Sequence, residues 1–267
     1  MIQRYIMAAA SAVAILTYAL AVFASTVWSE WSGDVMIIGE YHDNPVHHAQ
    51  QQNAVNEIRP AAVVYEMLTP EEAAALADVP RNPDAMRQAT QGFHWTNIAD
   101  YADVLARSPV IIGAALPRTT MRAAFSDGAA AAFGADAAQY GLSASLPSEQ
   151  QATREALQFD AHCAAMPLEM MAGMVEAQRL RDAHFARTVL GALDRYGAPV
   201  ILITGNGHAR TDWGVPTYLT AVRPGLALES IGQGEDGVPP PGSFTWTLTD
   251  APAPPREDPC AAFAPKD

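Results

Sequence analysis

The sequence predicts an α/β fold in which a mostly parallel central sheet is flanked by helices. Short apolar runs of strand length alternate with longer segments of helical character. Helix-start or turn residues bound these runs, and strands that alternate with helices are typical of a parallel sheet. The first four runs span residues 34–38, 61–67, 109–116 and 199–204, and two further candidate strands span 226–231 and 244–249.

Helix-start signals follow the first two strands. Asn44 and Pro45 suit the N-cap and the first position of a helix that runs to about Ile58. The residues 69–72, Thr-Pro-Glu-Glu, form a capping box that opens a second helix. The chain therefore predicts strand–helix–strand–helix at its start, as in a parallel sheet.

A long helical region, residues 117–197, separates the third and fourth strands. We expect it to be an insertion that covers one side of the sheet. Its longest helix spans 167–196 and is expected to break or bend near Gly173. Residues 33–250 are predicted to form a single α/β domain.

Residues 1–32 are predicted to be a secretory signal peptide or an N-terminal membrane anchor. Arg4 is followed by a long apolar run, which contains Val22-Phe23-Ala24, a cleavage-type exit with its smaller residues at the first and third positions. The run suits a cleaved signal, and it is also long enough to span a bilayer. Both alternatives place the rest of the chain in the periplasm, free or anchored and facing it, and limit membrane contact to this segment.

The formal net charge of −13 argues against two classes of partner. Nucleic acids and anionic lipid surfaces attract basic proteins, and the chain has no basic run of the required kind. We therefore expect neither nucleic acid nor a lipid surface as a partner of the domain.

Two cysteines, Cys163 and Cys260, are predicted to form a disulfide in an oxidising compartment. The bond would tie the proline-rich C-terminal tail, residues 251–267, to the helical region. The alternative is a pair of free buried thiols. The sequence lacks C-x-x-C-H, which excludes covalent attachment of a c-type haem.

Polar residues follow three of the predicted strands. Glu40 and His42 follow the first, Glu66 ends the second, and Asn206 and His208 follow the fourth. Ligands of open parallel sheets bind beyond the carboxyl ends of the strands, so we expect these side chains to converge on one site. Glu40 and His42 are two residues apart and would point the same way in an extended chain.

Two further histidines, His47 and His48, fall in the first turn of the following helix. A helix N-terminus disfavours imidazolium and keeps the ring able to accept a proton or bind iron. They are secondary ligand candidates, the alternative being a surface position.

Arg181 and Asp182 share a face of the long helix with Gln178 and Phe185. Such a pair could orient site histidines or hold a carboxylate, or it could belong to a solvated stripe of ion pairs. The sequence contains no H-E-x-x-H, G-x-S-x-G or Walker motif.

Several motifs together resemble the ChaN-type haem-binding uptake proteins of a Tiki-like superfamily that includes erythromycin esterases. They are GEYHDNPVHHAQQ, VVYEM, GAALPR, AQRLRDAHFA and ITGNGHARTDWGVP, in this order over about residues 34–232. The resemblance implies an α/β fold and a haem-binding role in bacterial iron acquisition. It also implies that Glu40, His42, Glu66 and His208 form the site.

Two functions remain open from the sequence. The first is a protein that binds haem non-covalently, with Tyr41 and Tyr65 as further candidate iron ligands and a homodimer as one arrangement. The second is a hydrolase, with or without a divalent metal, in which Glu40 or Glu66 is the general base. His42 and His208 would then be ligands or proton carriers.

Overall fold

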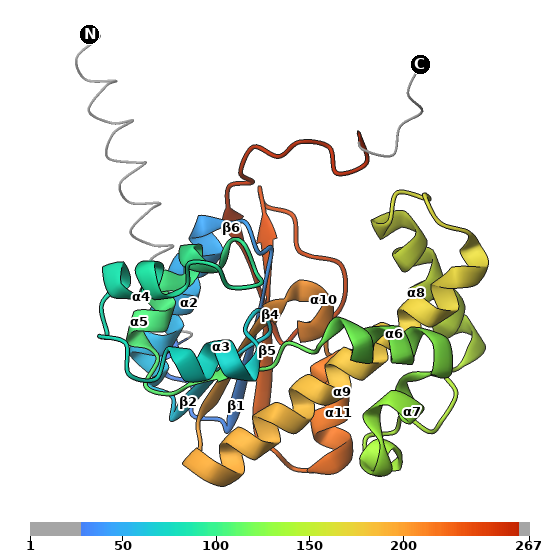
Figure 1. The fold of residues 1–267 in the computed structure, drawn as a ribbon, viewed down its shortest axis with the longest axis horizontal. Coiled ribbons are helices and arrows are strands. Elements are labelled where there is room, and N and C mark those ends of the chain that lie inside the picture. Colours follow the sequence, from blue (N-terminus) through green and yellow to red (C-terminus); the bar gives the residue numbers. More distant parts are fainter. Residues whose placement is uncertain (1–27, 262–267) are drawn as a thin grey trace, which may run out of the picture.

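The computed structural model describes residues 28–261, and six strands in it form one parallel sheet (Figure 1). The order across the sheet is β3-β2-β4-β1-β5-β6. The strands are β1 (Val35–Glu40), β2 (Ala62–Tyr65), β3 (Ile111–Gly113), β4 (Val200–Gly205), β5 (Leu228–Glu235) and β6 (Trp246–Ala251). The α/β fold and its parallel sheet, predicted from the sequence, are confirmed.

The register of the central strands brings their carboxyl ends level. β1 pairs with β4 along its whole length, from Val35 opposite Val200 to Glu40 opposite Gly205. β2 lies on the other side of β4, with Tyr65 opposite Ile203. The residues that directly follow β1, β2 and β4 therefore lie close together, beyond the carboxyl ends of the strands.

One face of the sheet packs against the helices that follow β1 and β2 (Figure 1). These are α2 (Pro45–Ile58), α3 (Pro70–Ala75), α4 (Pro83–Ala89), the 3-10 helix η1 (Ile98–Tyr101) and α5 (Ala102–Arg107). Alternate strand residues such as Met36 and Ile38 are fully buried against them. This side of the sheet carries one of the two apolar cores.

The other face packs mainly against the long helix α9 (Met171–Tyr196). The other helices of the described chain are α6 (Arg118–Asp127), α7 (Ala129–Phe133), η2 (Ala135–Ala138), α8 (Ser148–Ala161), η3 (Leu168–Met170), α10 (Asn206–Ala209) and α11 (Val215–Val222). Val35 and Ile37 bury their side chains in this second core. Helices α6 to α8 extend beside the sheet, as expected for an insertion between β3 and β4 (Figure 1).

The predicted helix starts agree with the structure. The Asn44 side chain accepts from the Val46 N–H, and both hydrogen bonds of the Thr69–Glu72 capping box are present. Of the break or bend expected near Gly173, the break is wrong, since α9 is continuous from Met171 to Tyr196. A Cβ at position 173 would lie 2.7 Å from the Phe125 carbonyl oxygen, so this glycine permits close contact between α9 and α6.

The predicted disulfide between Cys163 and Cys260 is confirmed and joins the end of α8 to the C-terminal tail. The tail is also held by Arg256, whose guanidinium contacts Asp43 and Glu235. The predicted signal or anchor lies almost entirely in residues 1–27, outside the described residues. Within residues 28–261, the helices are too short or too polar to cross a bilayer.

Candidate functional site

A cavity of about 600 Å³ lies between the carboxyl ends of the strands and helices α8 and α9. Four of the predicted site residues at its wall follow strands: His42, Glu66, Asn206 and His208. A fifth, Arg181, comes from α9. Apolar groups also contribute to the lining: Trp95, Leu157, Ala161, Val175, Trp213 and Pro241. The cavity therefore combines charged groups with apolar surface.

Glu40 is a fully buried carboxylate that holds His42 in place. Its side chain accepts hydrogen bonds from Gln51 Nε2 at 2.5 Å, Tyr101 OH at 2.5 Å and His42 Nδ1 at 2.9 Å. A carboxylate that accepts from Nδ1 fixes the tautomer of a histidine and leaves its Nε2 free to act. Glu40 itself does not line the cavity and contacts it only through His42.

A second carboxylate–histidine pair joins α9 to the segment after β4. His208 Nδ1 donates to Asp182 Oδ1 at 2.6 Å, and both side chains are buried. The ring edge of His208 also meets Phe185 at a centroid distance of 5.1 Å. Asp182 thus orients a site histidine, which is one of the roles that its position beside Arg181 predicts.

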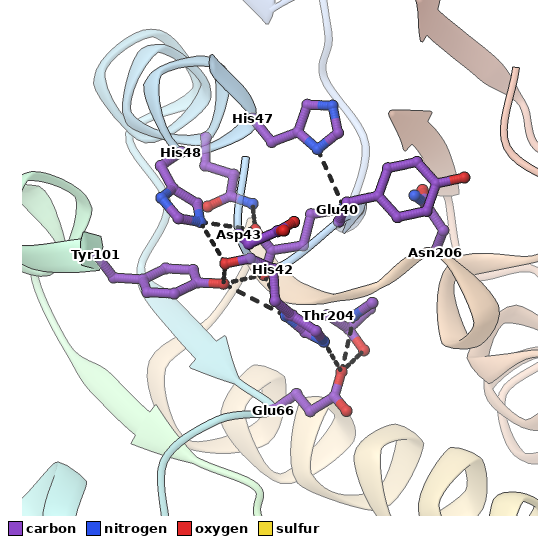
Figure 2. A network of polar contacts seen from close by, with 12 residues as sticks. Glu40, His42, Asp43, His47, His48, Glu66, Tyr101, Thr204 and Asn206 are labelled. Atoms are coloured by element: carbon purple, nitrogen blue, oxygen red, sulfur yellow. Dashed lines mark hydrogen bonds and ion pairs between the residues drawn. The ribbon is translucent and has the colours of Figure 1, made fainter. Parts of the chain in front are cut away.

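Glu66 lies between the two imidazoles. It accepts from Thr204 Oγ1 at 2.6 Å and from the Gly205 N–H at 2.8 Å. Its carboxylate oxygens lie 3.9 Å from His42 Nε2 and 3.6 Å from His208 Nε2. Figure 2 shows His42 between Glu40 and Glu66, so the two acids approach opposite edges of one ring.

The electrostatics favour a charged Glu66. Burial alone would raise its pKa, but His208, His42 and the hydrogen bonds from Thr204 and Gly205 outweigh burial and hold the pKa at about 2. Burial opposes a charge on His208, yet Glu66 and Asp182 raise the pKa of this imidazole. Burial likewise opposes the charge on His42, while Glu40 and Glu66 raise its pKa. The floor of the cavity is therefore a network of ion pairs.

Three predicted site residues do not line the cavity: Glu40, His47 and His48. His47 is buried with both ring nitrogens engaged, since Nδ1 accepts from the Tyr41 N–H and Nε2 donates to the Gly234 carbonyl. This makes His47 a neutral link between α2 and β5. His48 is buried against Tyr101, and its Nε2 donates to the His42 carbonyl (Figure 2).

Asn206 is chiefly a clamp. Its amide donates to the Gln233 carbonyl and its oxygen accepts from the Gln233 N–H, which ties α10 to β5. A Cβ at Gly39 would lie 2.7 Å from Asn206 Oδ1, so Gly39 leaves the room that α10 needs beside β1. These contacts fix the position of His208, two residues further along.

Residues that the sequence reasoning missed complete the site. Tyr101 and Gln51 hold Glu40, and Arg154 on α8 lines the cavity opposite the strand ends. Nothing in the pattern around Tyr101 or Arg154 distinguishes them from ordinary helix residues. Arg154 becomes visible only when α8 is placed over the carboxyl ends of the strands.

Substituting Gly205 by alanine is expected to displace the His42 ring. A Cβ there would lie 3.1 Å from His42 Nε2, which is tighter than normal contact. The expected loss of stability is about 1–2 kcal/mol, as for overpacking of a filled site. Thermal unfolding measures it, and Gly207→Ala is the control because a Cβ at 207 meets nothing within 4 Å. Equal effects of the two substitutions would contradict the close approach of Gly205 and His42.

Among the described residues 28–261, no group of three or more His, Cys, Asp or Glu side chains is placed to hold a metal ion. The divalent metal that the hydrolase hypothesis allows thus gains no support from this geometry. What the arrangement offers is two oriented imidazoles whose Nε2 atoms face a single carboxylate.

A comparison with protein families shows the family to which the chain belongs. The sequence model of the family described as haem-binding uptake, Tiki superfamily, ChaN, matches residues 30–219. The chain belongs to this family, which agrees with the resemblance of its motifs. No match to a curated protein sequence was found.

Two solved structures are similar to this chain. One is described as cofacial heme binding to ChaN of Campylobacter jejuni; it has a TM-score of 0.58 and 16% identity, over 82% of this chain and 87% of that one. This similarity supports the fold. The other is the type III effector HopBA1, with a TM-score of 0.40 and 12% identity, over 76% of this chain and 78% of that one.

Proposed function

We propose that this protein binds haem non-covalently in the cavity at the carboxyl ends of the strands and serves bacterial haem or iron uptake. Membership of the haem-binding uptake family is the observation that carries the proposal. The cavity supports it, because its volume of about 600 Å³ lies in the range of small-molecule sites, roughly 300–1,000 Å³.

The residues at the cavity fit a haem group. Trp95 and Trp213 offer apolar surface to a flat macrocycle, and imidazole is a common ligand of haem iron. Because Nδ1 of His42 donates to Glu40, its Nε2 is the ring atom that would bind iron, in exchange for the proton that Glu40 and Glu66 favour on this ring. His208, held by Asp182, offers the same donor from the other side of Glu66.

Tyrosine is the weaker choice of iron ligand in this chain. Tyr65 is fully buried in the core and shares a hydrogen bond with Ser108, so it does not reach the cavity. Tyr41 lines the cavity, but burial and the charge of Glu235 raise the pKa of its phenol. A raised pKa disfavours the phenolate that would bind iron. We therefore propose His42 or His208 as the axial ligand.

We propose that the protein works outside the cytoplasm. The Cys163–Cys260 disulfide is typical of proteins that fold in an oxidising compartment. The apolar run in residues 1–32 would supply export or anchoring.

Titration with haemin tests the haem proposal. We expect a saturable Soret shift at a fixed ratio of haem to chain, weakened at least about tenfold by His42→Ala or by His208→Ala, as for loss of a metal ligand or its orienting partner. His94→Ala is the control, because His94 lies outside the cavity with its side chain 47% exposed. Absence of a shift would sink the haem proposal. Gel filtration with and without haemin tests the homodimer.

A hydrolase remains the second candidate because two carboxylate-held imidazoles flank Glu66, as in acid–base sites. The geometry changes the assignment of the base. Glu40 lies behind the cavity wall, and Glu66 has a pKa of about 2, so His42 or His208 is the better base. Ester hydrolysis that disappears in both His42→Ala and His208→Ala, in protein that gives no Soret shift, would favour this function.

A further inference from the structure

Arg154 is a buried cation without a carboxylate partner. The residue is 7% exposed, on α8, and it lines the cavity. Its guanidinium lies over the Trp213 ring at 5.0 Å, donates a long hydrogen bond, of 3.4 Å, to the Trp213 carbonyl, and also interacts with the neutral Tyr218 hydroxyl. The Nε atom is buried and has no hydrogen-bond partner in the protein. Burying an unpaired charge is costly, so such a group calls for an anion from elsewhere.

The acids near Arg154 are already engaged. Burial lowers the pKa of Arg154, while Tyr218 and then Asp182 act to raise it, but the Asp182 Oδ1 accepts from His208 at 2.6 Å. No carboxylate within residues 28–261 comes within salt-bridge distance of Arg154. The protein leaves this guanidinium to face the cavity.

Arg181 on α9 adds a second cation to the same end of the cavity. It is half-buried, lines the cavity, and forms no ion pair with the described part of the chain. Arg210, which also lines the cavity, differs because Asp212 binds it through two hydrogen bonds. Two of the three cavity arginines are therefore available to a ligand.

We infer that Arg154 and Arg181 form a subsite for a carboxylate carried on an apolar body, which in haem is a propionate; this rests on the proposed function. Arginine donors form a planar fork that matches a carboxylate. Leu157, Ala161 and Val175 line the cavity beside the two arginines and suit the apolar body. Asp182 and Glu66 lie at the same cavity and disfavour a doubly charged phosphate.

Iron-free protoporphyrin IX and its dimethyl ester test the subsite without the metal. Porphyrin fluorescence would give both affinities for the wild type, Arg154→Gln, Arg181→Gln and Arg154→Lys. We expect the wild type to prefer the acid at least about tenfold, as for loss of a charge-assisted hydrogen bond. The preference should fall toward unity in Arg154→Gln, fall partly in Arg181→Gln, and recover partly in Arg154→Lys. Affinity for the ester should change little.

Arg195→Gln is the matched control, since Arg195 is an exposed arginine of α9 away from the cavity. It makes the same change in net charge and should keep the wild-type preference. Equal loss of acid and ester affinity in Arg154→Gln would show a merely structural role and overturn the inference. An acid preference that survives in Arg154→Gln would overturn it as well.

A second set of probes separates the subsite from haem binding. If neither porphyrin binds and haemin gives no Soret shift, the proposed function fails, and 2-naphthoate, its amide and 2-naphthyl phosphate are compared by thermal shift. Stabilisation by naphthoate alone, lost in Arg154→Gln, would keep the carboxylate subsite without haem. No stabilisation, or equal stabilisation by the phosphate, would overturn it.

Discussion

Replacing Glu40 by alanine is expected to lower the free energy of unfolding by about 3–5 kcal/mol, because one partner of a buried polar network is removed. The side chain is 0% exposed and accepts hydrogen bonds from Gln51, Tyr101 and His42. Alanine would leave the Gln51 amide and the Tyr101 hydroxyl without this acceptor and would open a cavity. Denaturant unfolding followed by circular dichroism measures the loss.

Two further variants separate the causes of this loss. Glu40→Gln keeps the volume but exchanges one acceptor oxygen for a donor, and should cost less than alanine. Glu57→Ala removes an exposed acid from α2, the helix that covers Glu40, and should change stability by less than about 0.5 kcal/mol. A Glu40→Ala protein as stable as Glu57→Ala would mean that the network contributes nothing net.

The fold could be predicted because its signals are local. The run at 35–38 is apolar at every position, which is typical of a parallel strand buried on both faces, and Asn44–Pro45 marks a helix start within a few residues. The predicted helix break at Gly173 was wrong for a physical reason. The role of Gly173 is the close contact with Phe125 on another helix, and the sequence around it carries no sign of that contact.

The convergence of polar residues at the candidate site could be predicted in outline because strand ends of a parallel sheet converge. That argument places Glu66 and His208 at one cavity before any contact is known. The strand-end argument does not show whether a side chain lines the cavity or lies behind its wall. Glu40 lies behind the wall because of the face of β1 on which its side chain lies. The same argument cannot place Arg154 at the cavity, because the position of Arg154 depends on how α8 packs on α9.

Replacing Glu66 by glutamine is expected to give a stability loss that depends on pH. The folded pKa of Glu66, about 2, lies below its usual 4.5, so its contribution is present above pH 4.5 and is lost as pH falls toward 2. The pKa values of His42 and His208 are raised above 6.5, so their contribution is present below pH 6.5 and is lost as pH rises through the folded pKa values. The difference between wild type and variant should therefore be largest between pH 4.5 and 6.5, at about 3 kcal/mol.

The difference between the two proteins is the useful quantity, because other histidines titrate in both. His184, for example, has its pKa lowered to about 4 by burial and by Arg187. Its pH-dependent contribution to stability is the same in both proteins and cancels in the difference. Glu72→Gln is the control: its partner His94 is about half exposed, so the pH-dependent part should stay below about 1 kcal/mol. Urea unfolding from pH 3 to 9 gives the profile. A loss for Glu66→Gln that is constant across this range would mean that Glu66 acts only as a hydrogen-bond acceptor for Thr204 and Gly205, and that its charge does not stabilise the two imidazolium rings.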